Sequence, residues 1–259
     1  MNDWVRFTFA LNARMQAFVD VRDALYCMDE ARRREEDLAW LQAASDLRAS
    51  LLGDMGRKAA LAEIIGLLDA LQTSLGHLAE EHPSLAPSIQ QACNRLDQHL
   101  QALQQPELSQ AGQFLVRDAL ISHYYNAQKK HDLLGHKQCL PQFLPTLRSD
   151  WKARVEFLHS LLTPLLEAIE TVDQMLNDYV QWQYRTAVEG SDKITPDRKQ
   201  HYGLLVVGLP RAQVASGLVP DMSGNQRVIR VRFQRWIPAQ SPEEVKESVD
   251  YAFMLVPIA

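Results

Sequence analysis

The chain has 259 residues, 46% of them hydrophobic, which is enough for one or two globular domains with a real core and excludes disordered and fibrous proteins. Its net charge of −5 gives the whole chain no attraction for nucleic acid or for an anionic membrane, so any basic patch must be local. With only 11 glycines and 12 prolines, turns are too sparse for an all-β protein, and long helices are expected.

The N-terminal segment predicts a strand followed by a helix. Apolar and polar residues alternate from Val5 to Phe9, which is typical of a half-buried strand. The spacing then becomes helical, with one apolar face formed by Leu11, Met15, Phe18, Leu25 and Met28. The mixed-charge run from Arg32 to Asp37 follows, and we interpret it as a solvated helix end, the alternative being a docking site for a partner.

Two later segments carry apolar residues in a heptad rhythm. The first seam consists of Ile64, Leu68, Leu71, Leu75 and Leu78, and the second of Leu158, Leu162, Leu165, Ile169, Val172 and Leu176. Pro164 lies inside the second seam, where it either begins a new helix capped by Thr163 or kinks a continuous one. Each seam is either packing within the chain or a dimer interface. Between the seams, 84–103 and 107–128 are predicted as two further helices.

After Trp182 the pattern changes to turns and short Val-rich runs. The predicted strands are 202–209, 227–236 and 251–257, with turns at Ser216-Gly217 and Ser223-Gly224-Asn225 between the first two. We expect one sheet built from these strands and the N-terminal strand. The predicted fold class is therefore α+β, with a mostly helical domain over 11–182 and a smaller antiparallel β-domain over 1–10 and 183–259.

Sequence motifs for common catalytic and cofactor sites are absent. The chain has no glycine-rich phosphate loop, nucleophile elbow or zinc-protease signature, and no cofactor is expected. Glu167, Glu170 and Asp173 share one side of a helix, a spacing more typical of a solvated face than of an acid/base pair. Three possible metal ligands, Asp132, His136 and Cys139, are spaced to share a helical face; His131 lies off that face, and Gly135 and Pro141 weaken the site.

The cysteines and the N-terminus favour the cytoplasm. Cys27, Cys93 and Cys139 are odd in number and far apart, which suits a reducing compartment. Asp3 stands where a signal peptide needs a positive start, and no stretch approaches the ~18 apolar residues of a membrane span. We expect a cytoplasmic protein that does not bind the membrane directly.

The strongest local feature is the predicted strand over 227–236. Alternation places Ile229, Val231 and Phe233 on one face and Arg230, Arg232, Gln234 and Trp236 on the other. Residues 200–236 contain five arginines, including Arg227 and Arg235, and one aspartate, a net charge of +4. An outward basic stripe that ends in an indole favours an acidic partner; the alternative is that the arginines only keep an exposed sheet face soluble.

Several segments, in collinear order, resemble the ZapD family of bacterial cell-division proteins, which associate with the tubulin-like protein FtsZ. The segments are the opening strand with Leu11-Asn12, then Gly112-Gln113-Phe114-Leu115 with Asp118 and Leu120-Ile121, then Leu162-Thr163-Pro164-Leu165 with Ala168, Ile169 and Val172, and finally Arg232-Phe233. Together they span the chain from about residue 5 to its end.

The resemblance implies a helical domain, a β-domain, a homodimer without enzymatic activity, and binding of the C-terminal tail of FtsZ so that filaments are cross-linked into bundles. It places Arg232 at a tail contact. A second family arginine falls on Val228, so Arg227 or Arg230 takes its role. A third falls near Met55, where Arg57 and Lys58 are the nearest substitutes. The family's Pro-Gly-Gly segment is replaced by the connector 131–141.

These observations predict a division factor at the mid-cell site whose partner-binding residues are Arg227, Arg230, Arg232, Arg235, Trp236, Arg57 and Lys58. The alternative is a helical metalloenzyme that uses Asp132, His136 and Cys139. A nucleic-acid binder that uses the Arg230 face is disfavoured by the negative net charge.

Overall fold

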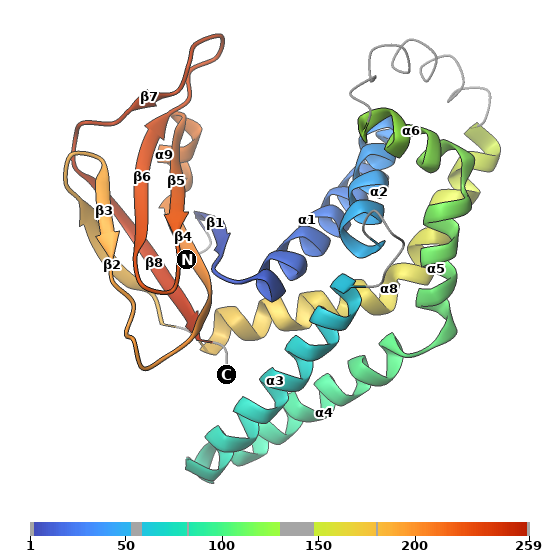
Figure 1. Cartoon of the computed structure of the whole chain (residues 1–259), viewed down its shortest axis with the longest axis horizontal. Coiled ribbons are helices and arrows are strands. Elements are labelled where there is room, and N and C mark those ends of the chain that lie inside the picture. Colours follow the sequence, from blue (N-terminus) through green and yellow to red (C-terminus); the bar gives the residue numbers. More distant parts are fainter. Residues whose placement is uncertain (1–2, 53–58, 82, 130–147, 180, 258–259) are drawn as a thin grey trace. The chain divides into compact units, whose positions relative to one another are not determined.

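The computed structural model describes residues 3–52, 59–81, 83–129, 148–179 and 181–257 (Figure 1). The fold class is α+β, as the sequence predicts, with helices followed by antiparallel sheets. By its internal contacts the chain divides into a β-unit, 1–16 with 174–259, and a helical unit, 17–173.

The helical unit is an assembly of mostly long helices. Its elements are α1 (Ala13–Arg33), α2 (Asp37–Leu52), α3 (Ala59–Glu81), a short 3-10 turn (Pro83–Leu85), α4 (Ala86–Leu103), α5 (Pro106–Arg117), α6 (Ala119–Lys129) and α8 (Arg148–Tyr179). The first of these begins after Asn12, whose side-chain oxygen accepts the backbone N–H of Met15 at 2.8 Å and so caps the helix.

Helix α8 makes side-chain contacts with α1, α2, α4 and α5. It carries the second heptad seam, and Leu158, Leu162, Leu165, Ile169 and Val172 are all buried within the chain. The side chain of Leu176 lies outside the described residues. The helix continues through Pro164, and the Thr163 hydroxyl donates to the carbonyl of His159 at 3.0 Å inside the helix instead of capping a new one. The second seam is therefore packing within the chain.

Helices α3 and α4 run side by side as an antiparallel pair (Figure 1). Ile64, Leu68 and Leu75 of the first seam are buried, and Leu71 is half-buried, so this seam too is used within the chain. The side chain of Leu78 lies outside the described residues.

The segment predicted as one helix over 107–128 is two helices. Helix α5 ends at Arg117, and the extended backbone of Asp118 separates it from α6. The Asp118 carboxylate accepts the backbone N–H groups of Leu120 and Ile121 at 3.0 and 3.1 Å, and it pairs with Arg154 of α8 at 3.1 Å. Asp118 thus caps α6, and its ion pair with Arg154 favours a break at this position over a continuous helix.

The β-unit contains two antiparallel sheets instead of the single sheet that the sequence predicts. The first has the order β1 (Trp4–Ala10), β4 (Tyr202–Pro210), β8 (Val249–Pro257), β2 (Gln183–Ala187). The second has the order β3 (Ser191–Ile194), β6 (Ile229–Arg235), β5 (Leu218–Gly224), with β7 (Glu243–Glu244) also paired to β6 and the short α9 (Arg211–Ala215) preceding β5. The N-terminal strand pairs with β4, as predicted.

A single hydrophobic core joins the two sheets. It contains inward-facing residues of β4 and β8 from the first sheet and of β6 from the second, among them Val207, Phe253 and Phe233. Phe7 and Phe9 of β1 pack against it. The predicted strands correspond to β1, β4, β6 and β8. Strands β2, β3 and β5 were not predicted, because turn-forming residues within or beside them interrupt the short alternation of apolar and polar residues.

Candidate functional site

Strand β6 presents its arginines on the outer face of the second sheet. The side chains of Ile229, Val231 and Phe233 are buried in the core, whereas Arg230 and Arg232 are exposed on the opposite side. This is the alternation that the sequence predicts, and it follows from the two-residue period of a pleated strand. The buried residues anchor the strand, so the two arginines stand on a rigid support.

Neighbouring strands add a third cation to this face. In the strand register Arg230 lies opposite Lys193 of β3, and Arg232 lies between Ser191 of β3 and Asp221 of β5. Directly opposite residues of antiparallel strands share a face, so we call the exposed surface around Lys193, Arg230 and Arg232 the basic face. Like charges on opposite residues repel each other and mildly destabilise the sheet. An acidic ligand bound at this face would offset the repulsion.

Within the part of the chain that the structure describes, no ion pair or hydrogen bond engages the side chains of Lys193, Arg230 and Arg232. Their charges are therefore directed at solvent and are available to a carboxylate or phosphate ligand. Sequence reasoning missed Lys193 because the residues before it, Glu189 to Asp192, resemble a turn. The alternation of exposed Lys193 with buried Ile194 is the signal that could have revealed the strand.

The other residues that the sequence predicts for partner binding near this strand differ in how accessible their side chains are to a ligand. Arg235 pairs with Glu247 at 2.7 Å, so its charge is partly neutralised. Arg227 lies in the β5–β6 turn, where the Asn225 side chain accepts its backbone N–H at 2.9 Å and leaves its side chain exposed. Trp236 is 60% exposed, and its indole N–H donates to Gln234 at 3.5 Å. The structure therefore brings an exposed indole to one end of the basic face.

A notch of about 260 Å³ lies beside Arg232, where β6 changes its pairing partner from β3 to β7. The backbone N–H of Phe233 donates to Gly190 at 2.8 Å on one side of this change, and its carbonyl accepts the N–H of Val245 at 3.1 Å on the other. Glu189 and Glu244 also line the notch. The basic face thus ends in a polar depression whose two glutamates oppose the entry of an acidic side chain.

The remaining candidates from the sequence lie outside the described residues or in the helical unit. Arg57 and Lys58 lie outside the described residues, as do His131, Asp132, His136 and Cys139 of the proposed metal site. In the described ranges, no group of three or more His, Cys, Asp or Glu side chains could hold a metal ion. Glu167 and Glu170 are exposed, while Asp173 pairs with Arg22 at 3.3 Å.

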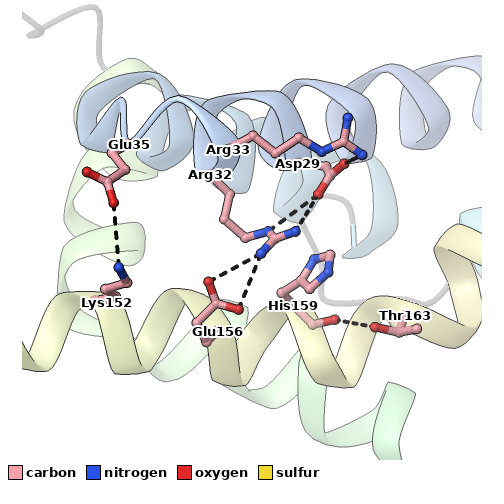
Figure 2. A network of polar contacts seen from close by, with 8 residues as sticks. All are labelled: Asp29, Arg32, Arg33, Glu35, Lys152, Glu156, His159 and Thr163. Carbon is pink, nitrogen blue, oxygen red and sulfur yellow. Dashed lines mark hydrogen bonds and ion pairs between the residues drawn. The ribbon is translucent and has the colours of Figure 1, made fainter.

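The helical unit has a charged site of its own at the corner between α1 and α2 (Figure 2). Arg32 donates to Asp29 at 3.0 Å and to both carboxylate oxygens of Glu156 at 3.3 Å, while Lys152 pairs with Glu35 at 3.5 Å. The run Arg32 to Asp37, interpreted from sequence as a solvated helix end, does include the end of α1, but Arg32 also links that helix to α8.

An open cavity of about 460 Å³ lies at this corner, with Trp40 and Trp151 on its wall at a ring-centroid distance of 5.0 Å. The Trp151 indole N–H donates to Asp37 at 3.0 Å. The cations of this corner are paired with nearby carboxylates. Arg33, for example, pairs with Asp29 and Glu30. These internal pairs make the corner a structural joint between helices, and it offers an acidic ligand less than the basic face does.

No protein-family model matches this sequence, and a search of curated proteins returns no significant match. Among the described residues, no helix is long and apolar enough to cross a membrane.

Proposed function

We propose that this protein is a non-enzymatic cell-division factor that binds the C-terminal tail of FtsZ and, as a homodimer, cross-links FtsZ filaments into bundles. This activity would promote Z-ring assembly in the cytoplasm at mid-cell. The observation that carries the proposal is the basic face, where Lys193, Arg230 and Arg232 stand exposed on one sheet of a chain whose net charge is −5. The resemblance to the ZapD family supplies the partner.

The proposed mechanism is electrostatic capture of an acidic tail segment. Guanidinium groups donate to carboxylates with fixed geometry, and the exposed indole of Trp236 adds apolar contact area at the end of the face. A filament displays many tails, and a dimer has two basic faces. Two modest contacts then combine into a much tighter attachment, so strong binding at a single site is not required for bundling.

The decisive variant is Arg230→Glu/Arg232→Glu. A hydrogen bond to a charged partner contributes roughly 1.5 to 3 kcal/mol, so the double substitution should remove most of the single-site affinity and add repulsion. Because both side chains are exposed and unpaired within the described chain, the melting temperature should change little. Binding is measured by titration with an FtsZ tail peptide, and bundling by co-sedimentation with FtsZ polymers that have or lack the tail.

Arg95→Glu/Arg117→Glu is the matched control, since it makes the same change in net charge at two exposed positions of the helical unit. This variant should bind and bundle like the wild type. Binding of the wild type should weaken as salt increases, because exposed charges are screened over about 8 Å at physiological ionic strength. A folded Arg230→Glu/Arg232→Glu protein that still bundles normally would place the site elsewhere, with Arg57 and Lys58 to be tested next.

A metalloenzyme that uses Asp132, His136 and Cys139 is the alternative from the sequence. It requires a stoichiometric metal ion, because in a metalloenzyme the bound ion activates the water or polarises the substrate. Metal analysis of the purified protein therefore separates the two functions before any assay with FtsZ.

A further inference from the structure

The first sheet of the β-unit has a pocket of about 450 Å³ that is separate from the basic face. Two aromatic rings, Trp4 of β1 and Tyr184 of β2, lie 6.2 Å apart and nearly perpendicular at an angle of 80°. They belong to the two outer strands of the sheet, and β4 and β8 run between them. The two side chains thus approach each other over the two strands that separate β1 from β2 in the sheet.

The two middle strands leave room for these rings on the sheet because their residues there are small. In the strand register Gly208 of β4 lies opposite Ala252 of β8, and Ala252 lies opposite Tyr184. A side chain at position 208 would stand 3.1 Å from the indoles of both Trp4 and Trp182. The glycine therefore lets aromatic rings lie directly on the sheet, where they form the wall of a pocket.

Two of the polar residues that line the pocket, Asp250 and Gln213, carry hydrogen-bond acceptor oxygens. Asp250 is exposed, and its carboxylate accepts the Thr186 hydroxyl at 2.5 Å. No cation among the described residues pairs with it. Gln213, which also lines the pocket, has a buried side-chain oxygen without a donor in the described chain. An anionic acceptor beside aromatic faces favours a cation that carries hydrogen-bond donors.

The cation that the chain itself places nearby is already engaged. Arg185 lines the same pocket, but its guanidinium stacks on Phe253 at 5.2 Å and pairs with Asp192 at 3.4 Å. On the same sheet, Arg6 stacks over Trp182 at 5.7 Å. In both contacts a guanidinium group lies over an aromatic ring of this unit. The pocket beside Trp4 and Tyr184 offers that arrangement, and no guanidinium of the described residues fills it.

We propose that this pocket binds an arginine side chain of a partner polypeptide. The guanidinium would stack on Trp4 or Tyr184 and donate to Asp250, and its apolar stem would cover the ring of Tyr184, which is 67% exposed. Arginine suits the site because its planar group can stack on a ring and donate in its own plane at the same time. The site is independent of the FtsZ proposal and needs neither FtsZ nor the basic face.

The probe is an acetylated and amidated pentapeptide, Gly-Gly-Arg-Gly-Gly, compared with the same peptide that carries uncharged citrulline. Binding is followed by NMR of the Trp4 indole N–H, assigned with the Trp4→Phe variant. The arginine peptide should shift this signal saturably, and the citrulline peptide should not. Asp250→Asn should weaken binding about tenfold, because it removes a charge-assisted hydrogen bond. Tyr184→Leu should weaken binding about threefold.

Tyr26→Leu is the matched control, since it removes an exposed aromatic ring from α1 in the helical unit, and its affinity for the peptide should equal that of the wild type. Thermal melts establish that each variant is folded. Equal binding of the citrulline peptide, or unchanged affinity in folded Asp250→Asn and Tyr184→Leu proteins, would overturn the assignment of a cation site. If free arginine binds as tightly as the pentapeptide, the proposal that the bound arginine belongs to a polypeptide is wrong.

Discussion

Gly190 is the residue on which the geometry of the basic face depends most directly. It follows Glu189 in a tight turn in which both residues have positive φ, 51° and 68°. A Cβ at this position would stand 2.1 Å from the carbonyl oxygen of Val245, so no other residue fits without a shift of the backbone. The turn transfers the chain from β2 in one sheet to β3 in the other, and β3 brings Lys193 opposite Arg230.

Two half-buried histidines of the helical unit link its stability to pH. Burial lowers the pKa of His159, and the positive charge of Arg32 lowers this pKa further. Burial also lowers the pKa of His99, whose ring nitrogen lies 2.9 Å from the Thr171 hydroxyl. Each of the two histidines therefore binds its proton at a higher pH in the unfolded chain than in the folded chain. The free energy of unfolding therefore decreases as pH falls below ~6.5, the usual histidine value.

We expect the urea midpoint of the wild type to be lower at about pH 5.5 than at about pH 7.5, and the His99→Gln/His159→Gln variant to show a smaller difference. Urea titrations monitored by circular dichroism measure both midpoints. The control is His201→Gln, which removes an exposed histidine from the β-unit. A double variant whose midpoint changes with pH as much as that of the wild type would show that other groups cause the dependence.

At the scale of secondary-structure elements, β1 and α8 show how distant segments complete each unit. Strand β1 pairs with β4 along its whole length, from Trp4 opposite Pro210 to Ala10 opposite Leu204. Helix α8 remains one helix through Pro164 because its buried face is held by contacts with other helices. Two such contacts are the ring pair Phe114 with Phe157 and the hydrogen bond between His99 and Thr171. Packing thus outweighs the local cost of proline in a helix.

Removal of residues 1–10 should lower the melting temperature by several degrees or more. The truncation deletes the pairing of β1 with β4 and the burial of Phe7 and Phe9, each of which contributes up to about 1.5 to 3 kcal/mol. Circular dichroism melts measure the loss. The Phe7→Ala/Phe9→Ala variant keeps the strand and should show only part of the loss. A truncated protein that melts like the wild type would contradict a structural role for β1.

At the scale of the whole molecule, the proposed function requires two basic faces in one particle. In both heptad seams most of the described residues are buried within the chain, which favours packing within the chain over the dimer interface that the sequence left open. The exposed apolar residues of the helical unit include Phe157, which is 50% exposed, and Val116, which is 45% exposed. An interface between two chains would have to use surface of this kind.

Light scattering should report twice the chain mass of 29.5 kDa at micromolar concentration. Two chains are needed because each has a single basic face, and bundling requires contact with two filaments. The same sample should bundle FtsZ polymers in a co-sedimentation assay. A protein that is monomeric yet bundles filaments would contradict the bivalent mechanism while leaving tail binding intact.

Features that depend on local periodicity could be predicted from the sequence alone. The alternation along β6 places Arg230 and Arg232 outward because successive side chains of a strand point to opposite faces, whatever strand lies beside it. The helical spacing of α8 likewise predicts its buried face. These features need no knowledge of distant residues.

Only the tertiary structure decided which distant residues meet. Lys193 joins the basic face through the pairing of β3 with β6, and Trp4 meets Tyr184 across two strands that lie between them in the sheet. Asp118 breaks a predicted helix because Arg154, 36 positions away, holds its carboxylate. Strand register and helix packing bring such residues together through contacts far apart in the chain, and a local pattern carries no information about them.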